Sequence, residues 1–193
     1  VKELSQVFVA GPPVAIALGE DVTKEEMGGW KIQGQNGTVD NVVNSEAEAF
    51  ETARRFLSYL PASVHELPER EQPNDTPDRR EESLISIVPT DGKTPYKPRK
   101  IVEATVDKGS FFEIGHDWGR GIVCGFARLD GYPVGILAGD PFFLDGAWTA
   151  DVCDKVARHM DLCSQFHLPV VHFVDCPGFA VGVKAETAGV TRA

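Results

Sequence analysis

The chain has 193 residues, of which 42% are hydrophobic and 25% are charged, and this composition is that of a globular protein. Its formal charge of −10 argues against a general binder of nucleic acids or of anionic membrane surfaces, because both would be repelled. No apolar run reaches the roughly 18 residues that a membrane span needs. The start, Val1-Lys2-Glu3, has neither an initiator Met nor a signal peptide, so we expect a cut end there.

Short elements are predicted in the first third of the chain. Residues 6–10 predict a buried strand that is closed by Gly-Pro-Pro at 11–13, and a short helix is expected over 13–18. Thr23 is positioned to cap a second helix, with Glu26 completing a capping box. The Gly-Gly pair that follows is interpreted as the end of this helix.

A longer helix is predicted to begin at Ser45, where Glu48 completes another capping box. Its apolar stripe is expected to consist of Ala49, Ala53, Phe56, Leu57 and Leu60. Residues 61–82 are polar and contain four prolines, which predicts an extended segment between two compact parts. We therefore divide the chain into residues 1–82 and 83–193.

The second part predicts an α/β arrangement. A helix is expected near 99–106, followed by two strands, 122–129 and 132–138, around an Asp-Gly hairpin turn. A helix over 146–166 and a buried strand over 170–174 complete a ββα pattern. The apolar face of this helix is predicted to consist of Val152, Val156, Met160 and Cys163. Two i,i+4 ion pairs are predicted on the opposite face, Asp151–Lys155 and Asp154–Arg158.

Three separated motifs of the second part occur in an order typical of one enzyme family. They are Phe111-Phe112-Glu113-Ile114, then Gly125-Phe126-Ala127-Arg128, then the sequence from Val174 to Arg192. In the first part of the chain, residues 7–12, 21–29 and 57–61 are typical of the same family. The chain resembles the carboxyltransferase (beta) subunit of biotin-dependent acyl-CoA carboxylases of the propionyl-CoA and methylcrotonoyl-CoA type.

This resemblance implies a crotonase-like ββα superhelix with parts of two repeated halves. Residues 1–82 are then the end of the N-terminal half plus a linker, and residues 83–193 are the first part of the C-terminal half. Members of the family are much longer, so we expect a partial chain. Both glycine-rich oxyanion loops of the family are expected outside it, and the 193-residue chain alone is expected to be inactive.

The turn after the last predicted strand is the main candidate site. From the residues alone, 175–182 is either a structural connection or a ligand loop, in which proline and glycine let backbone N–H groups approach an anion. The resemblance implies that Pro177, Gly178, Phe179 and Gly182 line the biotin pocket, largely through backbone. No catalytic side chain and no metal are expected, since peptide N–H groups can stabilise the anions.

Other clusters have simpler interpretations. The basic residues Lys93, Lys97, Arg99 and Lys100 are either a solvated loop or a contact for CoA phosphates. The loop 114–121 around Trp118 is a possible substrate loop, and His116-Asp117 is unsuited to acid–base catalysis because adjacent residues rarely face one point. Cys163, His167 and His172 are interpreted as core residues, and all four cysteines as unpaired thiols in a reducing compartment.

The resemblance implies carboxyl transfer from carboxybiotin on a carrier protein to the α-carbon of an acyl-CoA such as propionyl-CoA or acetyl-CoA. Its partners would be a biotin carboxylase, a biotin carboxyl carrier and further copies in a hexamer, with neither nucleic acid nor membrane. The location would be the bacterial cytoplasm or the mitochondrial matrix, of which the resemblance favours the cytoplasm. A biotin-dependent acyl-CoA decarboxylase, a crotonase-type hydratase or isomerase, and a non-catalytic assembly module are the alternatives.

Overall fold

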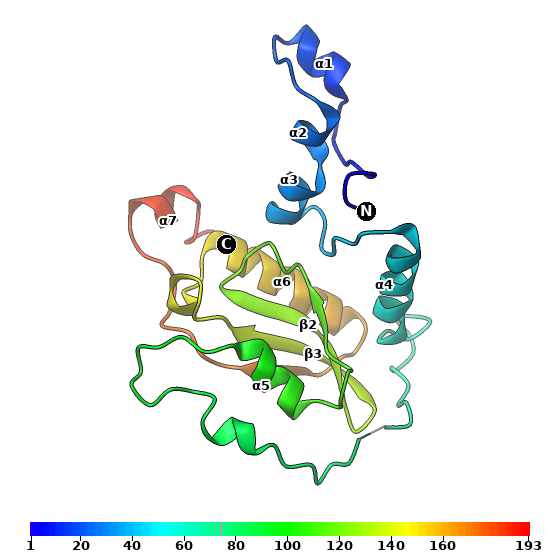
Figure 1. The fold of residues 1–193 in the computed structure, drawn as a ribbon, viewed down its shortest axis with the longest axis vertical. Coiled ribbons are helices and arrows are strands. Elements are labelled where there is room, and N and C mark those ends of the chain that lie inside the picture. Colours follow the sequence, from blue (N-terminus) through cyan, green and yellow to red (C-terminus); the bar gives the residue numbers. More distant parts are fainter. Residues whose placement is uncertain (74) are drawn as a thin grey trace.

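A four-stranded sheet forms the centre of the computed structural model, which describes residues 1–73 and 75–193 (Figure 1). Its order is β1 (Phe112–Ile114), β2 (Ile122–Leu129), β3 (Tyr132–Gly139) and β4 (Val170–Phe173). The first three strands are antiparallel neighbours, and β4 runs parallel to β3. Asp130 and Gly131, which join β2 to β3, both have positive φ, as a tight hairpin turn requires. The predicted hairpin is confirmed.

Helices cover both faces of this sheet, which confirms the α/β class. Helix α5 (Pro98–Thr105) packs on one face through Val102 and Val106, which are almost completely buried. Helix α6 (Ala150–Gln165) packs on the other face through Val152 and Cys163. Because α6 connects β3 to β4, the predicted ββα unit is present, with the helix behind the strands in Figure 1.

The N-terminal part projects away from the sheet as a chain of short helices (Figure 1). The remaining helices are α1 (Pro12–Ala17), α2 (Lys24–Gly28), α3 (Trp30–Gln35), α4 (Glu46–Ser58), α7 (Val183–Thr187) and the short 3₁₀ helices η1 (Glu82–Ile85) and η2 (Leu144–Gly146). The capping box of Thr23 and Glu26 is confirmed, with both hydrogen bonds present. At α4 the Ser45 hydroxyl accepts from Glu48 N–H as predicted, whereas the Glu48 carboxylate accepts from Asn44 N–H instead. No helix within the described ranges is long and apolar enough to cross a membrane.

The strand predicted over residues 6–10 is wrong. These residues form no ladder in the structure, and the side chain of Val9 is fully exposed. A strand needs a neighbour to pair its backbone groups, and the projecting segment offers none. The N–H of Val7 instead donates to the carbonyl of Gly28, which ties the segment to the end of α2.

The apolar stripe predicted on α4 is partly wrong. Ala53 is exposed and Leu57 is 61% exposed, because the helix approaches the sheet only with its last turn. There Phe56 lies 5.7 Å from the ring of Phe126, and the buried Tyr59 lies 5.6 Å from the same ring. The end of α4 therefore shares one apolar cluster with β2.

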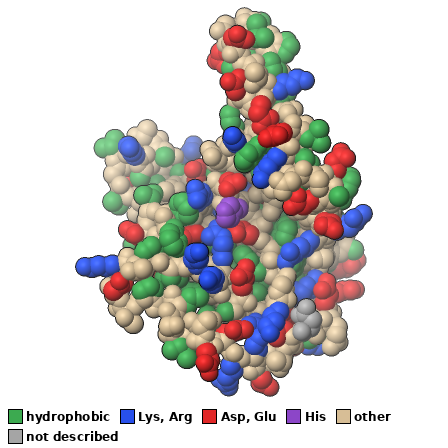
Figure 2. All heavy atoms as spheres, in the orientation of Figure 1, with side chains coloured by type: hydrophobic (Ala, Val, Ile, Leu, Met, Phe, Trp, Pro, Cys, Tyr) green, Lys and Arg blue, Asp and Glu red, His purple; other side chains and the backbone are tan. Residues whose placement is uncertain are grey.

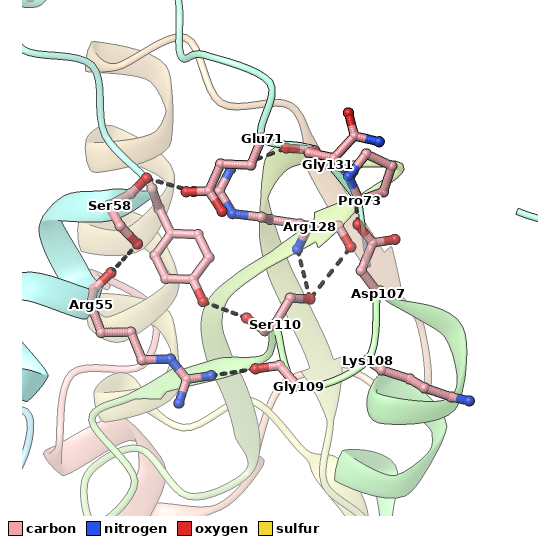
Figure 3. A pocket seen from close by; sticks show the side chains of 12 residues that line it. Arg55, Ser58, Glu71, Pro73, Asp107, Lys108, Gly109, Ser110, Arg128 and Gly131 are labelled. Carbon is pink, nitrogen blue, oxygen red and sulfur yellow. Dashed lines mark hydrogen bonds and ion pairs between the residues drawn. The ribbon is translucent and has the colours of Figure 1, made fainter. Parts of the chain in front are cut away.

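A polar junction connects this end of α4 to the linker and the hairpin (Figure 3). The almost buried Arg128 donates to the carbonyls of Ser58 and Gly131 and to the carboxylate of Glu71 at 2.5 Å. The Tyr59 hydroxyl donates to the carbonyl of Ser110. These groups surround a cavity of about 260 Å³ and satisfy one another, so we interpret the junction as structural.

Candidate functional site

The predicted ligand turn, residues 175–182, lies on the surface directly after β4, and we call it the Pro-Gly turn. Gly178 and Gly182 have φ values of 121° and 108°, which only glycine adopts without strain. The turn is held to the start of α6 by a short bridge, in which Trp148 N–H donates to the carbonyl of Gly178 and Ala180 N–H donates to that of Trp148. The turn is therefore exposed but fixed at one point.

Several peptide donors of the Pro-Gly turn are available to a ligand. The N–H of Gly178 is engaged with the Cys176 sulfur at 3.2 Å. Within residues 1–73 and 75–193, by contrast, no acceptor takes the N–H of Phe179, Val181 or Gly182. Free N–H groups on a fixed loop are suited to stabilise negative charge.

An apolar groove of about 680 Å³ borders the Pro-Gly turn, and we call it the indole groove. Its lining combines the start and one face of α6 with the turn and the C-terminal residues: Trp148, Cys153, Val156, Ala157, Phe179, Ala180, Val181, Glu186, Val190, Thr191, Arg192 and Ala193. Of the four residues predicted for a biotin pocket, Phe179 lies in this lining and is 63% exposed. Pro177, Gly178 and Gly182 belong to the same turn but do not line the groove.

Trp148 is the residue of this groove that sequence reasoning missed. Its ring meets that of Phe179 edge-on at 6.0 Å. Its Nε1–H is buried and has no acceptor in the described part of the chain. A buried donor without a partner is costly, so this N–H is an exception among the buried polar side-chain atoms of the described residues. The sequence feature that could have indicated Trp148 is its position as an aromatic residue directly before Thr149, the N-cap of α6.

A hydrogen bond and a close backbone approach position the base of the Pro-Gly turn. The hydroxyl of Tyr96, from the segment before α5, donates to Asp175 Oδ2 at 2.5 Å. Burial and the neighbouring carboxylate raise the pKa of Tyr96, which keeps the phenol a donor. Gly139, at the end of β3, passes so close that an added Cβ would lie 2.0 Å from the carbonyl oxygen of Asp175.

Residues of α6 fix the possible substrate loop 114–121 in place. Trp118 is buried and stacks against Arg158, so it cannot act as an exposed ligand platform. The ammonium of Lys155, a residue 2% exposed, donates to three carbonyls, two in the loop and one at the start of β2: Gly115 at 2.8 Å, Trp118 at 2.9 Å and Ile122 at 2.9 Å. Burial lowers the pKa of Lys155, while the three acceptors favour its charged form.

The predicted i,i+4 ion pairs on α6 are therefore wrong. Lys155 turns inward to the loop instead of pairing with Asp151 on the helix surface. Arg158 pairs with Asp40 and also donates to the carbonyl of Gly37, rather than pairing with Asp154. In both cases the cation binds acceptors on another segment, which are backbone carbonyls for Lys155 and a carboxylate with a carbonyl for Arg158. Met160, predicted for the apolar face, is 40% exposed.

The predicted basic cluster separates into two kinds of residue. Arg99 is neutralised by Glu113, at 2.5 Å, and by Asp140, at 2.7 Å. Burial opposes the ionisation of Glu113, yet the hydrogen bonds and charge of Arg99 hold its pKa below the ordinary value. His116 contacts Glu113 at 3.2 Å. Arg99 is thus a structural residue, whereas Lys97 and Lys100 remain exposed beside a cavity.

Of the three residues interpreted as core, Cys163 is buried, whereas His167 and His172 are exposed, so the interpretation is wrong for both histidines. Cys124, Cys153 and Cys163 are buried, Cys176 is half-buried, and all are free thiols, as predicted. Burial raises the pKa of Cys124 to about 12 and that of Cys163 to about 11, which keeps these thiols protonated. His167 contacts the carbonyl of Val64 rather than Cys163.

The whole chain, residues 1–193, matches the carboxyl transferase domain. The chain belongs to the carboxyl transferase domain family. It is 37% identical to the carboxyltransferase subunit of propionyl-CoA carboxylase from Haloferax mediterranei and 34% identical to the alpha subunit of methylmalonyl-CoA decarboxylase from Veillonella parvula. Both comparisons cover all of this chain and 38% of the relative, so the carboxyl transferase domain described here spans less than half of the length of these relatives.

A solved structure of the same family confirms the fold. The crystal structure of transcarboxylase 12S, a hexamer with hydrolysed methylmalonyl-CoA bound, matches with a TM-score of 0.92 at 34% identity. The match covers 97% of this chain and 37% of the transcarboxylase chain. The sequence resemblance to acyl-CoA carboxylases is thus confirmed at the level of the family, while the division into parts of two repeated halves stays a prediction.

Proposed function

We propose that this chain forms part of a biotin-dependent carboxyltransferase that moves a carboxyl group from biotin on a carrier protein to the α-carbon of an acyl-CoA. The observation that carries the proposal is the Pro-Gly turn, which combines unpaired peptide N–H groups with an adjacent groove. Its partners would be a biotin carboxylase, a biotin carboxyl carrier and further copies of the protein. The relatives named for propionyl-CoA favour a short acyl group.

The groove and turn fit the bicyclic ring of biotin. The ring is apolar at its edge and carries a polar urea, so it needs an apolar wall with a few placed donors. Phe179 and Trp148 supply the apolar wall, and the N–H groups of the Pro-Gly turn supply the donors. We assign Pro177, Gly178, Phe179 and Gly182 to this site, with the first two shaping the turn.

The chain's own contribution to the chemistry is electrostatic. When bound, biotin supplies the carboxyl group and a ureido nitrogen that takes up negative charge as the group leaves. The free N–H groups of Phe179, Val181 and Gly182 offer fixed donors for such charge, and one donor of this kind is worth about 3–4 kcal/mol in a preorganised site.

The reverse reaction, decarboxylation of an acyl-CoA such as methylmalonyl-CoA, is the second candidate. It is favoured by the 34% identity to the methylmalonyl-CoA decarboxylase subunit, which is close to the identity to the propionyl-CoA carboxylases. Decarboxylation and carboxylation use the same donors because both pass through the same charge distribution. Incubating the natural gene product with carboxylated biotin carrier protein and propionyl-CoA, or with uncarboxylated carrier protein and methylmalonyl-CoA, measures the two directions separately.

The substitution Phe179→Ala tests the site. In the natural gene product with its carrier protein, we expect transfer of radiolabelled carboxyl group to fall about tenfold or more, because one wall of the groove is lost. Phe50→Ala is the matched control, since Phe50 on α4 is exposed to the same degree, 62% against 63%. If both variants were as active as wild type, the Pro-Gly turn would not be part of the biotin site.

A further inference from the structure

Packing does not fix the middle of the Pro-Gly turn. An added Cβ at Gly178 or Gly182 would meet no atom of the described residues within 4 Å, apart from the chain neighbours of each glycine. Val181 in the turn and Val183 at the start of α7 are largely exposed, and Figure 2 shows hydrophobic side chains on the surface around α7. Glycine has more backbone freedom than any other residue, so other interactions are needed to fix Gly178.

The side chain of Cys176 provides two of these interactions. The N–H of Gly178 donates to Cys176 Sγ at 3.2 Å, and the thiol donates to the carbonyl of Gly178 at 3.5 Å. The sulfur therefore contacts the peptide group before Gly178 and the peptide group after it. Pro177 has no N–H, so the N–H of Gly178 is the first backbone donor that follows Cys176. Acceptance from the N–H two residues on is how Asn and Asp side chains shape turns.

The backbone that carries this sulfur is stiff. Asp175, directly before Cys176, accepts a hydrogen bond from the Tyr96 hydroxyl, and Gly139 approaches its carbonyl closely. The ring of Pro177 fixes its own φ and restricts the residue before it to extended conformations. The position of Sγ is therefore determined by the end of the sheet, and the sulfur transmits this position to Gly178.

The carbonyl of Gly178 also has a partner at the start of α6. The N–H of Trp148 donates to this oxygen at 3.0 Å. The carbonyl of Gly178 and the N–H of Phe179 belong to one peptide group, and a trans peptide directs its N–H opposite to its C=O. The bonds to the carbonyl therefore turn the N–H of Phe179 away from Trp148. This N–H is one of the three in the turn that have no acceptor among the described residues.

We propose that Cys176 is a positioning residue for carboxyl transfer. Its thiol need not touch the ligand, because its two hydrogen bonds set the plane of the peptide group between Gly178 and Phe179. The N–H of Phe179 is thereby kept free and oriented for the negative charge that develops on biotin. Peptide donors stabilise such charge strongly only when their orientation is fixed before the reaction. This inference rests on the proposed function and adds a residue that does not line the indole groove.

Replacement of the sulfur in the natural gene product, assayed with carboxylated carrier protein and propionyl-CoA, tests the proposal. Cys176→Val removes both hydrogen bonds at similar side-chain volume. We expect kcat to fall about tenfold and KM for the carrier protein to change less than about twofold, because the oriented donor acts on charge that forms during the reaction. Cys176→Asn and Cys176→Ser keep an acceptor for the N–H two residues on, and at least one of them should restore most of the wild-type kcat.

Cys124→Val is the matched control, because it makes the same replacement at a free thiol on β2, outside the turn. It should keep the wild-type kcat. Hydrogen–deuterium exchange resolved to single residues provides a measurement that does not depend on activity. The N–H of Gly178 should exchange about fivefold faster in Cys176→Val than in wild type, and at the wild-type rate in Cys124→Val.

The outcomes separate this inference from the function on which it rests. A wild-type protein that transfers no carboxyl group would overturn the proposed function itself. An active wild type whose Cys176→Val variant keeps full kcat would overturn only the positioning role of Cys176. The same conclusion would follow from equal Gly178 exchange in wild type and Cys176→Val, or from a loss of kcat that neither Cys176→Asn nor Cys176→Ser reverses.

Discussion

The hydroxyl of Tyr96 and the carboxylate of Asp175 form a 2.5 Å hydrogen bond that joins the segment before α5 to the base of the Pro-Gly turn. The two residues are 79 positions apart in the sequence. The bond matters because the turn leaves the sheet at Asp175 and its remaining residues are largely exposed. Tyr96 thus holds the first residue of the turn, and the short bridge to Trp148 holds its middle.

Tyr96→Phe removes this bond and leaves the ring in place. We expect a loss of about 1 kcal/mol in the free energy of unfolding, since the pair is partly solvated. We also expect a larger effect on carboxyl transfer than on stability, because the donors of the Pro-Gly turn lose their fixed position. Denaturant unfolding and transfer assays measure the two effects. Tyr132→Phe, at an exposed tyrosine that has no hydrogen bond in the described structure, should leave both unchanged.

Gly139→Ala tests whether the end of β3 determines the path of the turn. An added Cβ would lie 2.0 Å from the carbonyl oxygen of Asp175, so backbone must move. We expect a loss of about 1–3 kcal/mol in unfolding free energy together with reduced transfer. Gly11→Ala is the control, because its Cβ would meet only ordinary contacts at 3.6 Å. If both alanine variants unfold at the same denaturant concentration, the close approach of β3 and the turn is not a constraint.

Arg99→Met tests the buried ionic group between α5 and the sheet. It would leave the Asp140 carboxylate, whose side chain is 2% exposed, without its cation. We expect a loss of about 3–5 kcal/mol, because an unpaired buried charge is costly. Adding Asp140→Asn should restore part of this loss. A double variant that is less stable than Arg99→Met would contradict the pairing.

The sequence predicted the elements whose signals are local. Asp130-Gly131 between two apolar runs determined the hairpin, and Thr23 with Glu26 determined the start of α2. Each depends on residues within a few positions of one another. The prediction of a strand over residues 6–10 was wrong because a strand also needs a neighbour, which the apolar pattern does not specify.

The candidate site was predictable only in part, for the same reason. The Pro-Gly turn was predicted from its proline and glycines as a possible ligand loop, and its place in a biotin pocket, which the family resemblance implies, stays a proposal. Trp148 contacts the Pro-Gly turn through a bridge between residues about 30 positions apart, and no local sequence pattern predicts such a contact. Lys155 resembled a surface lysine with an acidic neighbour four residues before it. Its inward direction depends on three carbonyls of the distant loop 114–121 and the start of β2.

The buried His159 should make the protein sensitive to acid. Its ring lies 5.4 Å from that of Phe126, and burial together with the charges of Lys155 and Arg158 lowers its pKa to about 4. An unfolded histidine takes up a proton near pH 6.5. Between these two values the unfolded chain therefore binds a proton that the folded chain does not, and stability falls as the pH falls from 6.5 towards 4.

His159→Gln measures this contribution. We expect wild type to lose about 3 kcal/mol of unfolding free energy to this group between pH 7.5 and pH 4. The variant should be less stable at pH 7.5 but should lose correspondingly less on acidification. His65→Gln, at an exposed histidine, should keep the wild-type pH profile. Denaturant unfolding at several pH values gives the slopes, and identical slopes for wild type and His159→Gln would show that His159 is not buried in its neutral form.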